Sequence, residues 1–143
     1  MAIARTDFHQ PLTHPVQLVL VVSALPLFLG ALLSDWAYSV SFQVQWINFA
    51  AWLNAGALVF LGAALLWSVA AALRSRAGSR RASWMFVGAI AATFVVGFIG
   101  ALIHAKDAAA TMPAGLYLSA VVLILTVITI WLGFAGHRAG DAT

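Results

Sequence analysis

The sequence contains no cysteine and no glutamate, and charged residues make up only 8% of its 143 positions. Without cysteine the chain can form no disulfide, no thiolate metal site and no cysteine nucleophile. Each of the four acidic residues is an aspartate near the edge of an apolar stretch, which argues against a carboxylate proton relay through a membrane centre. Soluble domains usually carry about 25% charged residues, so a water-soluble domain is excluded.

Sequence motifs for soluble chemistry are also missing. We find no phosphate-binding glycine loop, no HExxH metalloprotease motif and no nucleophile elbow. Seven lysines and arginines give a pI near 10.2, but they form no basic face, so we expect no nucleic-acid partner. These absences favour a non-enzymatic protein over an enzyme.

Apolar residues dominate what is present. They make up 64% of the chain, and the mean hydropathy is +1.01. A membrane-spanning helix needs roughly 20 apolar residues, and four stretches qualify: residues 15–34, 46–73, 84–104 and 114–136. The sequence therefore predicts a single all-α domain over residues 1–143, an integral membrane four-helix up-down bundle with lipid as its main solvent.

Prolines mark the expected starts of two spans. Pro15 suits a first helical turn, where its missing N–H costs nothing, and His14 is then the expected cap. Pro113 precedes the fourth span in the same way. Pro26 lies inside the first span and should bend it.

The basic residues predict the orientation of the chain in the membrane. Arg5, the four arginines between positions 74 and 81, and Arg138 fall on one side, and only Lys106 falls on the other, next to Asp107. Because basic residues accumulate on the cytoplasmic side, we expect both termini to be cytoplasmic. Aromatic residues are expected at both interfaces: Trp36, Tyr38, Trp46 and Tyr117 outside, and Trp67, Trp84 and Trp131 inside.

Small residues predict how the helices associate, because helices in lipid pack closely through small side chains. The third span carries Ala89, Thr93, Gly97 and Ala101 at an unbroken spacing of four, widened by Gly88, Ala92 and Gly100. The second span offers Ala51, Ala55 and Ala63 on one stripe and Gly56 and Ala64 on another; the fourth offers Ser119, Thr126, Thr129 and Gly133. We expect these faces to join the bundle, or to bind a protein partner or a second copy.

Two histidines could hold a cofactor on the cytoplasmic side. His14 begins the first span and His137 ends the fourth, so both lie at the same depth. A b-type haem with two imidazole ligands is one interpretation. The alternative, which we favour because ligation also needs facing rings and supporting hydrogen bonds, is two interfacial histidines that cap helices or meet headgroups.

Asp35 and His104 form a second candidate pair at the outer boundary, with Lys106 and Asp107 close in sequence. A proton-linked site or a site for a quinone headgroup is one interpretation of the pair, and a structural ion pair is the other. We favour the structural one, because such pairs are often only structural. Asn48 and Asn54 are expected to form interhelical hydrogen bonds.

Several of these segments together resemble a bacterial membrane-protein family catalogued as domain of unknown function 2231. The likeness runs from about residue 13 to residue 138. It rests on Thr13-His14-Pro15, on Ser34-Asp35-Trp36-Ala37-Tyr38, on Ala51-Trp52-Leu53 with Gly56, and on His104-Ala105-Lys106-Asp107 leading to Met112-Pro113-Ala114-Gly115-Leu116.

The resemblance implies a four-span inner-membrane protein that accompanies periplasmic sugar or alcohol dehydrogenases and cytochromes, in an anchoring or electron-passing role. The chain departs from the family pattern at two places. Trp67-Ser68 stands where relatives carry an Asp, and Leu18, Val19 and Leu20 stand where a second His is expected. Both departures count against a cofactor centred on His14.

Three classes of function follow, in this order. The first is a non-catalytic membrane subunit that anchors or assembles a partner, such as a periplasmic dehydrogenase or a cytochrome. The second is a small electron-transfer subunit that binds a b-type haem or a quinone. A transporter comes last, because no polar path crosses the predicted spans.

Overall fold

The computed structural model describes residues 14–75 and 78–141, except for the side chains of residues 136–141. All regular secondary structure in this part is helical: α1 (Pro15–Ser41), α2 (Val44–Arg74), α3 (Arg80–His104), the short α4 (Ala108–Thr111) and α5 (Ala114–Asp141). The four long helices are each long and apolar enough to cross a membrane, with mean hydropathies of 2.1 to 2.5 over their most apolar segments. Both α1 and α3 extend beyond the predicted spans, to Ser41 and back to Arg80.

The start of α1 follows from its sequence. His14 is the N-cap: its Nδ1 accepts from the Val16 amide, and the Gln17 side chain accepts from the His14 amide at 2.6 Å. Together these bonds form a capping box, and Pro15 occupies the first helical position, so the predicted cap is confirmed. At the other end Phe42 adopts a left-handed conformation (φ 56°), and its amide bonds to the Tyr38 carbonyl.

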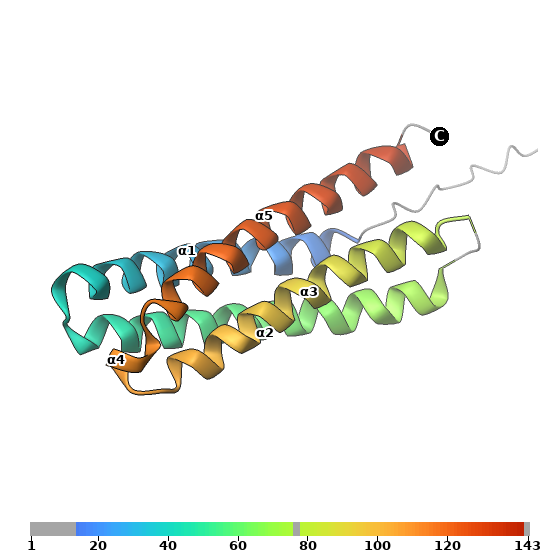
Figure 1. The fold of residues 1–143 in the computed structure, drawn as a ribbon. Helices are drawn as coiled ribbons and strands as arrows, with labels where there is room; N and C mark the ends of the chain where they lie inside the picture. Colours follow the sequence, from blue (N-terminus) through green and yellow to red (C-terminus); the bar gives the residue numbers. More distant parts are fainter. Residues whose placement is uncertain (1–13, 76–77, 142–143) are drawn as a thin grey trace, which may run out of the picture.

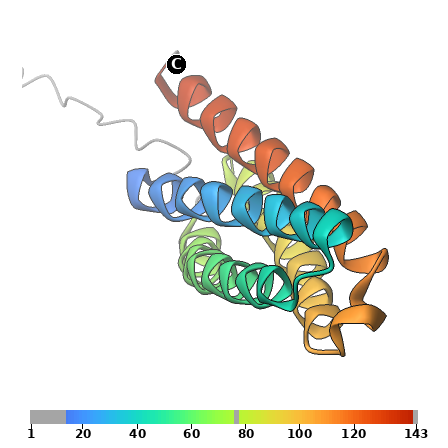
Figure 2. The ribbon, with the colours of Figure 1, turned by 90° about the vertical axis from the view of Figure 1, so that its left-hand side faces the viewer.

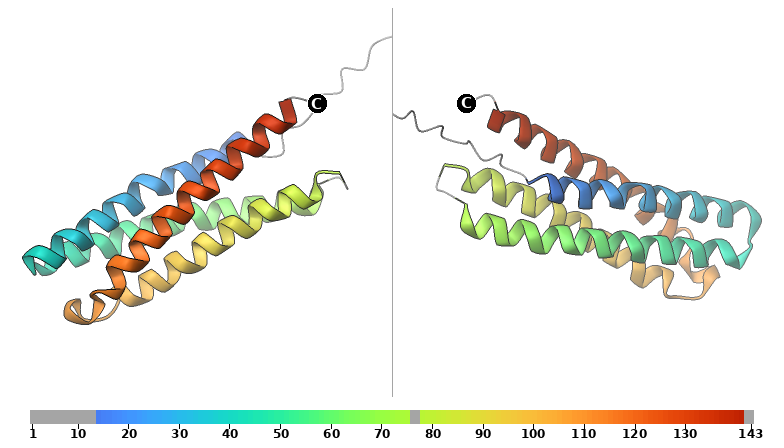
Figure 3. Two further views of the ribbon diagram at one scale, coloured as in Figure 1. Left: turned by 45° about the horizontal axis from the view of Figure 1, so that its top comes forward. Right: turned by 180° about the vertical axis from the view of Figure 1, so that it is seen from behind.

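Each long helix packs against two others, in the cyclic order α1, α2, α3, α5. Figure 1 places the α1–α2 connection and α4 at one end of the molecule, and the α2–α3 turn with the C-terminus at the other. We call these the α4 end and the arginine end. Figure 2 shows the four long helices around a common interior. Figures 1 and 3 show α5 crossing α1 and diverging from it toward the C-terminus.

A 3.5-residue repeat sets the buried face of the helices. The buried positions of α5 alternate in spacing between four and three: Gly115, Ser119, Val122, Thr126, Thr129 and Gly133. The same alternation runs through Ile90, Thr93, Gly97, Gly100 and His104 of α3. This repeat is the signature of helices that pack side by side along their length. Phe28, Leu61 and Ile90 fill the centre of the core.

The repeat separates the correct small-residue predictions from the wrong ones. The predicted α5 face is confirmed, as are Thr93, Gly97 and Gly100 of α3 and Ala64 of α2, since all of these are buried. The predictions that placed Ala55, Ala63, Gly88 and Ala92 in the bundle interior are wrong, because these residues are exposed. A spacing of four drifts away from a 3.5-residue buried face, so those stripes turn outward.

Candidate functional site

A pair of ionisable residues lies inside the bundle at the α4 end. Asp35 comes from α1, six residues before the helix ends at Ser41, and His104 is the last residue of α3. The His104 Nε2 atom lies 2.8 Å from Asp35 Oδ1, and the two side chains are 1% and 0% exposed. The structure thus brings together the two residues that the sequence analysis paired at this boundary.

A third helix completes the cluster. The Ser119 hydroxyl on α5 donates to Asp35 Oδ2 at 2.5 Å, and His104 Nδ1 bonds to the Gly100 carbonyl at 2.8 Å. We call Asp35, His104 and Ser119 the polar cluster. It connects α1, α3 and α5, three helices that are far apart in sequence, so its geometry exists only in the folded bundle.

The donors and acceptors around Asp35 and His104 determine how many protons the pair holds. A backbone carbonyl can only accept, so His104 Nδ1 carries a hydrogen and donates it to Gly100. Asp35 Oδ2 accepts from Ser119, which leaves one proton for the contact between Oδ1 and Nε2. Whether that proton resides on the imidazole or on the carboxyl, the pair is neutral overall. A neutral pair with all its hydrogen bonds made is the form that burial in a low-dielectric interior tolerates.

The α3–α5 connection closes over the cluster. Thr111 is fully buried, and its hydroxyl lies within hydrogen-bonding distance of the Asp107 and Ile103 carbonyls, at 3.2 and 3.3 Å. A Cβ at Gly115 would lie 2.7 Å from Thr111 Cγ2 and 3.4 Å from His104 Cε1. The first turn of α5 can therefore sit against Thr111 and His104 only because position 115 has no side chain.

The arginine end carries a smaller polar layer between α1 and α2. Gln17 Nε2 donates to Ser68 Oγ at 3.0 Å, and both side chains are buried. The His14 ring lies against Trp67, with ring centroids 5.6 Å apart. The His137 side chain lies outside the described part of the structure, so the proposed pairing of His14 with His137 stays a prediction.

Two further contacts link helices between these layers. Asn54 Nδ2 donates to the Gly97 carbonyl at 3.1 Å, which confirms the interhelical role predicted for Asn54. Asn48, for which the same role was predicted, is exposed. The hydroxyls of Thr93 and Thr129 lie 3.0 Å apart across α3 and α5.

Ser119 was predicted on a packing face but not as a partner of Asp35, and Gln17 and Ser68 were not predicted as partners of each other. One available signal was their position on the 3.5-residue repeat, where a polar side chain has to find a partner inside the bundle. Among the residues whose side chains are described, no three His, Asp or Glu gather as a metal site.

Comparison with known proteins finds no matching family model, no similar curated protein and no similar solved structure.

Proposed function

We propose that this chain is an integral protein of a bacterial inner membrane, an up-down bundle with both termini in the cytoplasm. We further propose that it acts as a non-catalytic subunit that anchors or assembles a partner protein. The family resemblance implies a periplasmic dehydrogenase or a cytochrome as the partner. Four apolar helices support the membrane assignment, and the arginines gathered at one end support the orientation.

One observation carries the non-catalytic role. Every buried polar or charged side chain in the described part of the structure is hydrogen-bonded within the bundle. Catalysis or transport would need polar groups directed at a substrate or along a path. In this part of the chain the polar groups instead link neighbouring helices or, as in Ser34 and Thr126, bond to their own helix, which favours a membrane scaffold.

The orientation is tested with single cysteines, because the natural chain has none. We expect Gly78→Cys, in the exposed turn between α2 and α3, to be labelled only after the inner membrane is opened. Ala109→Cys, exposed in α4, should be labelled in intact spheroplasts. The opposite pattern would reverse the proposed orientation.

The anchoring role is tested by deleting the gene and measuring which proteins leave the membrane fraction. We expect a partner to move to the soluble fraction and to return when the chain is supplied again. The His14→Ala variant should restore it as well as the natural chain does. Unchanged membrane association of all proteins would contradict anchoring, and loss of the partner's activity in the variant despite normal assembly would contradict a non-catalytic role.

A second candidate function is electron transfer, which the Asp35–His104 pair favours. The pair shares one proton inside the membrane domain, and ionisable residues in such positions often belong to proton-linked sites. In this interpretation a quinone binds near Asp35 and His104, or a b-type haem is ligated by His14 and His137. A reduced-minus-oxidised spectrum and a quinone extraction of the purified protein test it: haem absorbance or stoichiometric quinone would support it, and a flat spectrum without quinone would reject it.

A further inference from the structure

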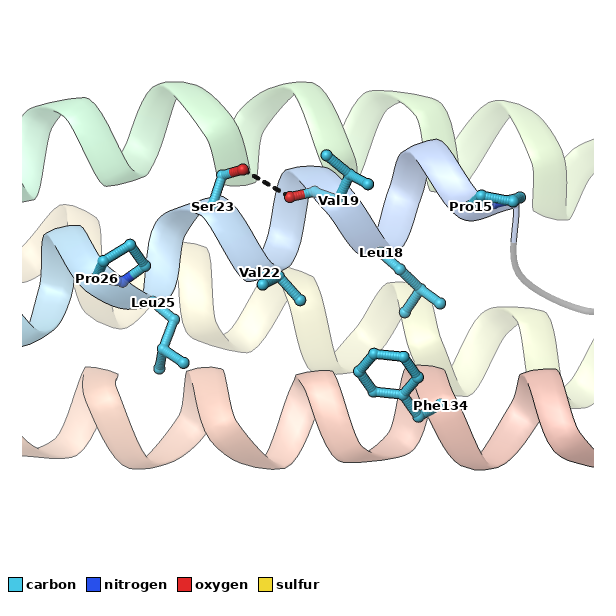
Figure 4. Close-up of a pocket in the computed structure, with 8 residues that line it drawn as sticks. All are labelled: Pro15, Leu18, Val19, Val22, Ser23, Leu25, Pro26 and Phe134. Atoms are coloured by element: carbon cyan, nitrogen blue, oxygen red, sulfur yellow. Dashed lines mark hydrogen bonds between the residues drawn. The ribbon is translucent and has the colours of Figure 1, made fainter.

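An apolar groove separates α1 from α5 toward the arginine end. It is a shallow, open groove of about 630 Å³, and its lining includes Pro15, Leu18, Val22, Leu25, Pro26 and Phe134. Figure 4 shows Leu18, Val22 and Leu25 directed toward α5, and Phe134 directed back from α5. The volume is within the range of about 300–1,000 Å³ that is typical of ligand sites.

The lining of the groove is apolar and therefore suits a hydrocarbon chain. Ser23 carries the one side-chain hydroxyl in the lining, and this hydroxyl donates to the Val19 carbonyl of its own helix at 2.8 Å. The other lining side chains are aliphatic, aromatic or proline rings. An occupant with polar groups at this depth would lose hydrogen bonds without replacement, so the groove suits an unbranched or isoprenoid chain.

The length of the groove matches the acyl chain of a lipid in one leaflet. Along α1 it extends from Pro15 to Pro26, about 16 Å at 1.5 Å per residue. That length is about half of the roughly 30 Å hydrocarbon core, and thus one leaflet.

Basic residues lie just beyond the same end. An added Cβ at Gly133 would contact both Leu18 and Phe86, so these two residues are at one level. Arg81 precedes Phe86 by five residues on α3, about 7 Å further toward the arginine end. Arg74 follows Ser68, the partner of Gln17, by six residues on α2. Among the described side chains the acidic ones, Asp35 and Asp107, lie near the opposite end.

We propose that this groove seats one acyl chain of an anionic phospholipid whose headgroup meets the basic residues at the arginine end. Basic sites beside transmembrane helices favour anionic headgroups, and the apolar groove holds the chain. The assignment of this lipid to the cytoplasmic leaflet rests on the orientation proposed above. The apolar groove and the basic residues beyond it do not depend on the anchoring role. A bound lipid would complete the contact between α1 and α5 whether or not the chain anchors a partner.

The test is native mass spectrometry of the protein released from nanodiscs of phosphatidylethanolamine and phosphatidylglycerol in equal amounts, with ubiquinone added. We expect the natural chain to retain one phosphatidylglycerol in preference to the other lipids. Val22→Phe fills the groove and should reduce retention roughly tenfold, which corresponds to 1.4 kcal/mol. Val59→Phe is the matched control, because Val59 is 72% exposed and does not line the groove; it should retain the lipid.

Further variants keep the test decisive. Leu25→Trp fills the groove from the next turn and should reproduce the loss if Val22→Phe does not fold. Arg80→Gln with Arg81→Gln should keep a bound lipid but abolish the preference for phosphatidylglycerol. No retained lipid, equal retention of both phospholipids by the natural chain, retention of ubiquinone instead, or equal loss in the control would each overturn the proposal. The nanodiscs contain no partner protein, so failure of the anchoring role leaves this result unaffected.

Discussion

The two ends of the bundle hold α1 and α5 together by different means. At the α4 end, Asp35 of α1 bonds to Ser119 of α5 and to His104 of α3. At the arginine end, the polar bond of α1 goes to α2 instead, through Gln17 and Ser68. There, α1 meets α5 through apolar contacts beside a groove of about 630 Å³.

The difference shows that the placement of polar side chains decides where a membrane bundle is closed. Apolar surfaces gain little by leaving lipid for each other, so apolar contacts alone hold two helices weakly. A hydrogen-bonded pair of ionisable residues inside the bundle has no comparable alternative in lipid, because separating its partners leaves a buried group uncompensated. The polar cluster therefore fixes three helices at one end, while α1 and α5 are free to diverge at the other.

The largest expected effect follows from removing the carboxylate of the polar cluster. Asp35→Ala leaves His104 and Ser119 without their partner, and we expect it to lower the free energy of unfolding by about 3–5 kcal/mol. Asp35→Asn is the matched control: its amide can donate to a neutral His104 and accept from Ser119. It should cost no more than about 1.5 kcal/mol. Denaturation in mixed micelles measures both, and equal losses would show that charge, rather than hydrogen bonding, holds this end closed.

Gly115 at the α4 end and Gly133 at the arginine end allow the tightness of packing at the two ends to be compared. Gly115→Ala would place a Cβ 2.7 Å from Thr111 Cγ2, and Thr111 is fully buried and hydrogen-bonded, so it cannot move aside. We expect a loss of about 1–3 kcal/mol. Gly133→Ala approaches Leu18 Cδ2 at 2.5 Å and Phe86 Cε2 at 3.0 Å. The shorter contact can be relieved because Leu18 can turn into the groove that it lines, so the loss should be smaller.

Two controls accompany the glycine variants. Thr111→Ser removes the methyl group that obstructs position 115 but keeps the hydroxyl, so it should partly restore Gly115→Ala. Gly88→Ala has open space around the added Cβ and should be neutral or stabilise the helix by up to about 1 kcal/mol. Thermal unfolding in detergent measures all four changes. A larger loss for Gly133→Ala than for Gly115→Ala would show that the arginine end is packed as tightly as the α4 end.

The hydrogen bond between α1 and α2 should contribute less than the polar cluster. Gln17→Leu removes the bond to Ser68 and one bond of the α1 cap, and we expect a loss of about 1 kcal/mol, within the range measured for hydrogen bonds in membrane proteins. Ser68→Ala should cost a similar amount, and the double variant should cost less than the sum because the two side chains share one bond. Additive losses would mean that the bond contributes nothing beyond packing.

Much of this architecture could be predicted from hydropathy and local sequence. The four long helices and the cap at His14 follow from apolar length and from Pro15. The proximity of Asp35 and His104 follows from their shared depth at the outer ends of the predicted spans. Bonds between facing helices could not be predicted, because they depend on which helices are neighbours and how each is rotated. Ser119 and Gln17 illustrate this limit: each is a common residue on its own helix and acquires a role only through a partner on another.

The smallest expected effect concerns the His14 cap at the arginine end. His14→Ala removes an acceptor for the Val16 amide, but this bond is 3.3 Å long and exposed, and Gln17 can still accept from the amide at position 14. We expect a loss of about 0.5 kcal/mol, the low end for N-caps, and little loss for His14→Asn, which can still cap. If His14 instead ligated a haem, both variants would lose the cofactor absorbance and a larger share of stability. A spectrum recorded beside each unfolding curve therefore distinguishes a helix cap from a haem ligand.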